Sequence, residues 1–87
     1  MTHELKTIEP YFTDIQSGVK TFDVRKNDRS YKVGDVVHFR QWLPLFTGYE
    51  WVYSGNGIIK TVTYILPGGQ FGIEPGYVVL GLSGGSS

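Results

Sequence analysis

The feature that most constrains the fold is the way turn-forming residues divide the chain into short segments with strand composition. VVHFRQW (36–42), IIKTVTYIL (58–66) and GYVVLGL (76–82) are rich in β-branched and aromatic residues, and stretches that contain glycine and proline separate them. Only the segment between Pro10 and Gly18 carries apolar residues at helical spacing. We therefore predict a mixed α+β, mainly β fold, a small barrel of five or six strands with one or two short helices.

Turn signals predict several local features. Pro10 suits the first turn of a helix, because its missing N–H would have no partner there, and Gly18 suits a left-handed cap, so we predict a helix of about two turns. Glycine and asparagine tolerate positive φ angles, and SGNG (54–57) therefore predicts a hairpin turn. SGGSS (83–87) has no apolar residue and predicts a disordered tail, which leaves residues 1–82 as a single domain.

Charge and composition narrow the classes of function. Eight basic and eight acidic side chains give a net charge of zero, which argues against a protein that coats duplex nucleic acid. Between Lys20 and Arg40, however, the sequence contains six basic and three acidic residues, so one side of the domain should be electropositive. Cysteine is absent, which makes a reducing, cytoplasmic setting the default. No segment approaches the roughly 20 apolar residues of a membrane span, and we expect no membrane association.

Charged residues alternate with apolar ones in the strand predicted after the helix. Phe22 and Val24 should share one face and fix the strand to the core, whereas Asp23 and Arg25 share the other. An ion pair between these two could orient the guanidinium for a phosphate or a base edge. As an exposed pair, it would contribute only about 0 to 1 kcal/mol and carry no function. Lys20 could bind a phosphate or act as a base, or could simply be solvated beside the helix end.

GVKTFDVR (18–25) matches the G-x-K-x-x-[E/D]-x-R signature of ASCH domains, which belong to the PUA-like superfamily. Residues 3–82 as a whole resemble a bacterial and phage branch of that superfamily, known as a domain of unknown function. Besides the signature, the resemblance rests on HELK, RKNDRSYKVGDVV, VTYIL and GGQFGIEPGYVVLGL. The resemblance implies a closed or nearly closed barrel, with a cleft beside the helix and the signature strand, in a superfamily associated with RNA binding.

Some small ASCH proteins are amidohydrolases that act on N-acylated cytidine through a lysine, a threonine and a glutamate. Lys20 matches the lysine, Asp23 stands in place of the threonine, and Glu74 is a loose match for the glutamate. In this alternative, Lys20 and Asp23 would be the catalytic residues. A carboxylate beside the lysine would oppose the neutral amine that a base requires.

The leading hypothesis is an RNA- or nucleotide-binding module whose cleft is lined by the signature strand. Lys26, Asn27 and Arg29 could form a basic turn that steers an anionic ligand, or only a solvated turn. His3 could border the cleft or cap the first strand, and Trp42 could stack an unpaired base or belong to the core. The candidate binding residues are Lys20, Asp23, Arg25, Lys26, Asn27, His3 and Trp42.

The expected partner is a nucleotide, a nucleoside or single-stranded RNA, and we expect a monomer. A third hypothesis is a protein partner that binds LPLFTGYEW (43–51) through Leu45, Phe46 and Trp51. His38 has no carboxylate or second histidine at ligand spacing, so we predict no metal site, and no motif indicates a cofactor.

Overall fold

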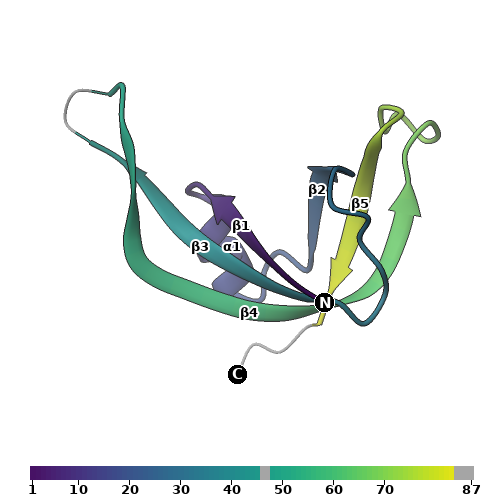
Figure 1. Cartoon of the computed structure of the whole chain (residues 1–87), viewed down its shortest axis with the longest axis horizontal. Coiled ribbons are helices and arrows are strands. Elements are labelled where there is room, and N and C mark those ends of the chain that lie inside the picture. The colour runs from purple at the N-terminus through teal and green to yellow at the C-terminus, as the bar shows by residue number, and fades with distance from the viewer. Residues whose placement is uncertain (46–47, 84–87) are drawn as a thin grey trace.

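Five strands form one mixed sheet in the computed structural model, which describes residues 1–45 and 48–83. Their order is β1-β3-β4-β5-β2, with β1 parallel to β3 and every other neighbouring pair antiparallel. Figure 1 shows the sheet bent into a U, with β1 and β3 in one wall, β5 and β2 in the other, and β4 running through both. The elements are β1 (Thr2–Thr7), α1 (Tyr11–Ser17), β2 (Phe22–Lys26), β3 (Val36–Pro44), β4 (Trp51–Pro67) and β5 (Tyr77–Leu82).

The sheet does not close into a barrel. β1 and β2 are the two edge strands, and no backbone ladder joins them within the described ranges. The predicted mixed, mainly β fold is confirmed with five strands and one helix, whereas the closed barrel is not. The bend in β4 makes the two walls face each other, but β1 and β2 do not come into hydrogen-bonding register, so a seam remains between them.

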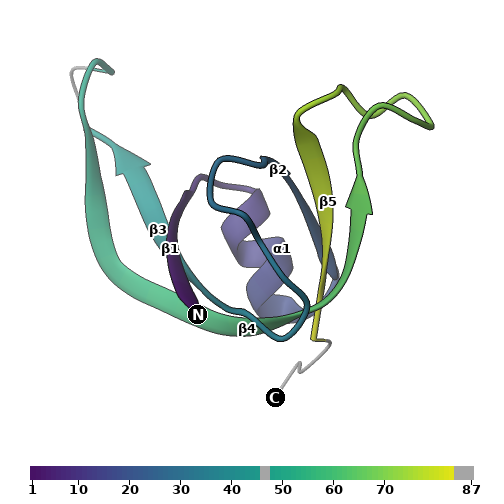
Figure 2. The ribbon, with the colours of Figure 1, turned by 45° about the vertical axis from the view of Figure 1, so that its right-hand side comes forward.

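The single helix forms where its sequence signals place it. Pro10 occupies the N-cap position, and Gly18 takes the left-handed C-cap conformation with φ 84° and donates its N–H to the carbonyl oxygen of Ile15. Figure 2 shows α1 in the space between the two walls of the U. Phe12 and Ile15 project from it into the core. Neither α1 nor any other described segment is a helix long and apolar enough to span a membrane.

The predicted hairpin turn at residues 54–57 is wrong. These residues lie within β4, a strand of 17 residues that runs continuously through the position of the expected turn. Gly55 does adopt a positive φ of 94°, but the sheet absorbs it as an irregularity opposite Gln41, where the β3–β4 register shifts. The Gln41 side chain accepts hydrogen bonds from the side chains of Ser54 and Asn56 there. The chain reverses instead between the end of β3 at Pro44 and the start of β4 at Trp51.

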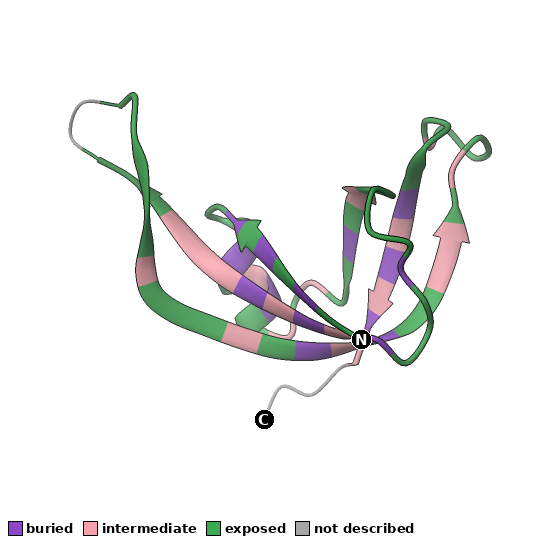
Figure 3. Ribbon diagram, in the orientation of Figure 1, coloured by how far each residue is buried: buried purple, intermediate pink, exposed green. Residues whose placement is uncertain are grey.

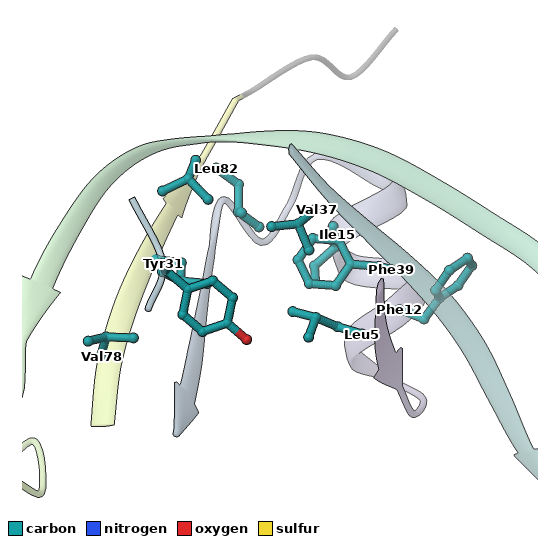
Figure 4. Close-up of a cluster of buried hydrophobic side chains, with 10 residues drawn as sticks. Leu5, Phe12, Ile15, Tyr31, Val37, Phe39, Val78 and Leu82 are labelled. Atoms are coloured by element: carbon teal, nitrogen blue, oxygen red, sulfur yellow. The ribbon is translucent and has the colours of Figure 1, made fainter. Parts of the chain in front are cut away.

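The core lies inside the bend of the sheet, as Figure 4 shows. Apolar side chains from α1 and from four of the five strands meet there, together with Tyr31 from the loop that follows β2. The buried members are Leu5, Phe12, Ile15, Tyr31, Val37, Phe39, Val62, Val78, Leu80 and Leu82. β2 contributes no apolar side chain to this cluster among the described residues.

The predicted orientation of β2 is therefore wrong. Phe22 and Val24 are each 47% exposed, whereas Asp23 is only 6% exposed and faces inward. Along β2 the residues are exposed, buried, exposed, intermediate and exposed in turn, and Figure 3 shows the strand coloured accordingly. Alternation separates the two faces of a strand but does not say which face lies inside. Here the other elements already fill the core, and the inner face of β2 borders the seam with β1, where charged groups find partners.

The predicted disordered tail lies almost wholly outside the described residues. Ser83 is described: its N–H donates to the carbonyl oxygen of Thr61, and its hydroxyl oxygen accepts the Thr61 N–H. Residues 84–87 are outside the described ranges, as is Phe46.

Candidate functional site

Asp23 is the centre of a charged cluster on the inner face of β2. Its Oδ1 lies 3.2 Å from Lys20 Nζ, and its Oδ2 lies 2.5 Å from Arg25 Nε. The Lys20 and Arg25 side chains are 17% and 23% exposed, so all three groups are partly withdrawn from water. A buried carboxylate needs such partners, because its desolvation is otherwise costly. The sequence-predicted Lys20, Asp23 and Arg25 therefore come together at one place.

Arg25 bridges the seam that the backbone leaves open. Its Nη2 donates to the carbonyl oxygen of Lys6 at 2.8 Å and to Thr7 Oγ1 at 3.1 Å, both on β1. Its Nε is at the same time bound to Asp23. Three contacts from one planar group fix the guanidinium and link the two edge strands through a side chain. The arrangement gives the cleft beside it one rigid cationic wall.

Lys20 is held by an ion pair and by aromatic rings. Its Nζ lies 4.6 Å from the ring centroid of Tyr11 and 5.5 Å from that of Phe22, in addition to its contact with Asp23. Both the carboxylate and the ring faces stabilise an ammonium group. Glu74, the loose match for a catalytic glutamate, lines a different hollow together with Val24. The geometry thus gives Lys20 the surroundings of a structural or ligand-binding cation.

A hollow of about 380 Å³ opens beside this cluster. Five of the eight basic side chains of the chain line it, against two acidic ones, Glu4 and Asp28. We call this hollow the basic cleft and define it by its cations, which are Lys6, Arg25, Lys26, Arg29 and Arg40. The cleft carries a local excess of positive charge in a chain whose net charge is zero.

Tyr31 adds a polar group to the wall of the basic cleft. Burial raises the pKa of its hydroxyl above the usual value, against the opposing effect of the nearby Arg25 charge. The phenol therefore stays neutral at physiological pH and can donate a hydrogen bond to an anion.

Pairing between distant segments assembles the basic cleft. The parallel β1–β3 ladder places Lys6 directly beside Arg40, and the turn after β2 brings Lys26 and Arg29 to the same hollow. Lys26 was predicted as a site residue from the sequence, whereas Lys6, Arg40 and Tyr31 were not. Alternation in HELK could have placed Lys6 opposite the buried Leu5, but no local signal predicts that β1 pairs with β3.

Two further hollows adjoin the basic cleft. One, of about 380 Å³, lies over the seam and includes Tyr11 and Asp23 together with Lys6, Arg25 and Lys26, which it shares with the basic cleft. The other lies beyond Lys6, whose Nζ is 4.3 Å from the ring centroid of Trp42. The predicted site residues Lys26 and Trp42 therefore border this connected region.

The structure places His3 elsewhere. It is buried, with Nε2 2.8 Å from Asp35 Oδ2 and its ring edge-on to Tyr31 at 4.8 Å between centroids. The hydrogen bond to His3, together with one from the backbone N–H of Lys32, lowers the pKa of Asp35 to about 2. His3 thus stabilises the attachment of β1 and does not line the basic cleft.

The remaining expected residues fall outside the basic cleft. Asn27 is exposed, and its backbone N–H donates to the carbonyl oxygen of Gly76. Nδ1 of His38 lies 3.6 Å from Oε1 of Glu4. Within residues 1–45 and 48–83, no group of three or more metal-ligating side chains is close enough to hold an ion. Leu45, of the proposed protein-binding segment, is exposed.

The comparisons with known proteins identify a family. The model of DUF3850, a domain of unknown function, matches residues 2–82, and the chain therefore belongs to that family. A search of curated proteins finds no match.

Proposed function

We propose that this DUF3850 domain binds a phosphate-bearing ligand, a nucleotide or a short segment of single-stranded RNA, in the basic cleft. One observation carries the proposal: most of the basic side chains of a chain with no net charge line a single hollow. Basic side chains that serve only solubility need not gather at one place. The convergence of five basic side chains on this hollow therefore favours a ligand whose anionic groups occupy it.

The donors in the basic cleft match the chemistry of phosphate. Three of its five cations are arginines, whose planar guanidinium can present two parallel N–H donors to phosphate oxygens. Asp23 and the β1 edge fix Arg25, so little side-chain entropy is lost when an anion binds next to it. Glu4 and Asp28 limit the excess charge, which favours a ligand with few phosphates over a long backbone.

The amidohydrolase alternative has less support. It requires Lys20 to act as a free base, whereas its Nζ is engaged by the Asp23 carboxylate and lies over the rings of Tyr11 and Phe22. Glu74 faces a separate hollow. Incubation with N⁴-acetylcytidine tests the amidohydrolase alternative directly. If the wild type hydrolyses this compound and Lys20→Ala does not, hydrolysis and not binding is the main function.

Fluorescence anisotropy with a labelled, 5′-phosphorylated RNA tetranucleotide tests the proposal. Binding should weaken as salt rises, and each phosphate contact should contribute about 0.7 to the slope of log affinity against log salt. Arg29→Gln should weaken binding several-fold and reduce that slope by about 0.7. Lys32→Gln is the matched control, because it removes the same charge from outside the basic cleft.

Two results would contradict the proposal. One is the absence of binding at millimolar RNA or nucleotide. The other is an equal loss of affinity in Arg29→Gln and Lys32→Gln, which would mean that only the overall charge matters and the basic cleft does not.

A further inference from the structure

An apolar hollow of about 330 Å³ adjoins the basic cleft on the β3–β4 side. It is lined by Lys6, Ile8, Trp42 and Trp51, which include both tryptophans of the chain. Its volume lies within the range of ligand pockets in proteins, roughly 300 to 1,000 Å³. Trp51 is 45% exposed, so an indole surface there is open to a ligand.

The register of β3 and β4 brings the two indoles together. Trp42 pairs with Tyr53, and Trp51 lies two residues from Tyr53 on the same strand. Residues two apart on a strand share a face, so Trp42 and Trp51 are diagonal neighbours across the ladder. Two large ring systems on one face, beside the aliphatic side chain of Ile8, form an apolar surface suited to a flat aromatic ligand.

Lys6 joins this hollow to the basic cleft. Its side chain lines both, and its ammonium group lies 4.3 Å from the ring centroid of Trp42. A ligand that places an anionic group in the basic cleft can therefore reach the indoles with an attached aromatic group. A nucleotide has this combination of charge and ring.

Unpartnered donors occur at the same place. Among the described residues, the buried side-chain nitrogens that lack a hydrogen-bond partner are Arg40 Nε and Trp42 Nε1. Arg40 lines the basic cleft, and Trp42 lines the apolar hollow. A buried donor without an acceptor is costly, and each of these two nitrogens belongs to a side chain that lines one of the two hollows.

We infer that the Trp42–Trp51 hollow is a base-binding subsite, in which a nucleobase stacks on the indoles while its phosphate occupies the basic cleft. This inference rests on the proposed function and specifies its ligand: a nucleotide with an exposed base, free or within a single strand. Stacking on an indole tolerates every base, so the subsite provides affinity more than sequence selectivity.

Intrinsic fluorescence tests the inference in the unaltered protein, because both tryptophans lie in the proposed subsite. Adenosine monophosphate or the RNA tetranucleotide should quench tryptophan emission on binding. Ribose 5-phosphate, which lacks a base, should compete with the labelled RNA and leave the emission nearly unchanged.

A variant separates stacking from phosphate binding. Trp51→Leu should weaken RNA binding about 5- to 150-fold, as expected for the loss of one stacked base, and leave the affinity for ribose 5-phosphate unchanged. Tyr64→Leu is the control, because Tyr64 is an exposed aromatic of β4 outside the hollow. Circular dichroism checks that both variants fold.

The outcomes distinguish failure of the inference from failure of the proposed function. Suppose that Arg29→Gln weakens RNA binding, but that RNA does not quench the wild-type emission or that Trp51→Leu does not change the affinity. Either result would overturn the base subsite and leave the phosphate-binding proposal intact. If neither RNA nor ribose 5-phosphate binds at millimolar concentration, both proposals are overturned.

Discussion

Asp23→Asn perturbs the charged cluster with the smallest change of shape. The substitution removes the negative charge that Lys20 and Arg25 share and places an amide NH₂ group where a carboxylate oxygen accepted a hydrogen bond. Both cations then lose an ion pair in a partly buried site. We therefore expect a loss of folding stability larger than that caused by breaking a surface ion pair.

The structure sets the expected size of the effect. Breaking a fully buried ion pair costs about 3 to 5 kcal/mol, whereas an exposed pair is worth about 0 to 1 kcal/mol. Lys20 keeps some contact with water, and Arg25 keeps its bonds to the Lys6 carbonyl and the Thr7 hydroxyl. We therefore expect the free energy of unfolding to fall by about 2 to 3 kcal/mol in Asp23→Asn.

Urea denaturation followed by circular dichroism measures this loss. Asp28→Asn is the matched control, because the Asp28 side chain is 60% exposed and its ion contact with Arg29 Nε is long, at 4.0 Å. It should change stability by less than about 1 kcal/mol. If Asp23→Asn loses no more stability than Asp28→Asn, the cluster behaves as an exposed surface pair and does not stabilise the fold as described here.

Two further predictions concern folding stability. The pKa of Asp35, lowered to about 2 by its bonds to His3 and to the Lys32 backbone, lies below its usual 3.8. Its contribution to the free energy of unfolding is therefore present above about pH 4 and lost as pH falls towards 2, and Asp35→Asn should flatten acid denaturation curves over that interval. Gly68→Ala would place a Cβ 2.1 Å from the backbone carbonyl oxygen of Glu74, so it should lower stability by about 1 to 3 kcal/mol, and an unchanged melting temperature would contradict this.

Local signals predicted the helix and most of the strands, but not which face of β2 points into the core. Pro10 and Gly18 mark the ends of α1 because the conformations that they favour are properties of single residues. The inward face of β2 depends on which neighbours fill the core, and apolar side chains from the other strands already do so. Asp23 can face inward only because Lys20 and Arg25 are within reach, and spacing alone does not decide between this arrangement and its reverse.

The candidate site was predicted only in part, because local patterns can be read from the sequence and pairings between distant segments cannot. The signature strand supplies the cluster around Asp23 within a few residues of sequence, so alternation placed Asp23 and Arg25 on one face. Lys6 and Arg40 join the basic cleft through the parallel β1–β3 ladder, a pairing between segments far apart in the chain. Trp42 and Trp51 meet through the β3–β4 register, which the wrongly predicted turn at residues 54–57 would have changed.

The most direct test of the central claim is an amide NMR titration of the wild-type domain with adenosine monophosphate. We expect the largest chemical-shift changes on residues of the basic cleft, including Lys6, Arg25 and Arg29, and further changes at the indole N–H of Trp42. Changes centred on the exposed Phe22 and Val24 face of β2, or no changes at millimolar nucleotide, would contradict it.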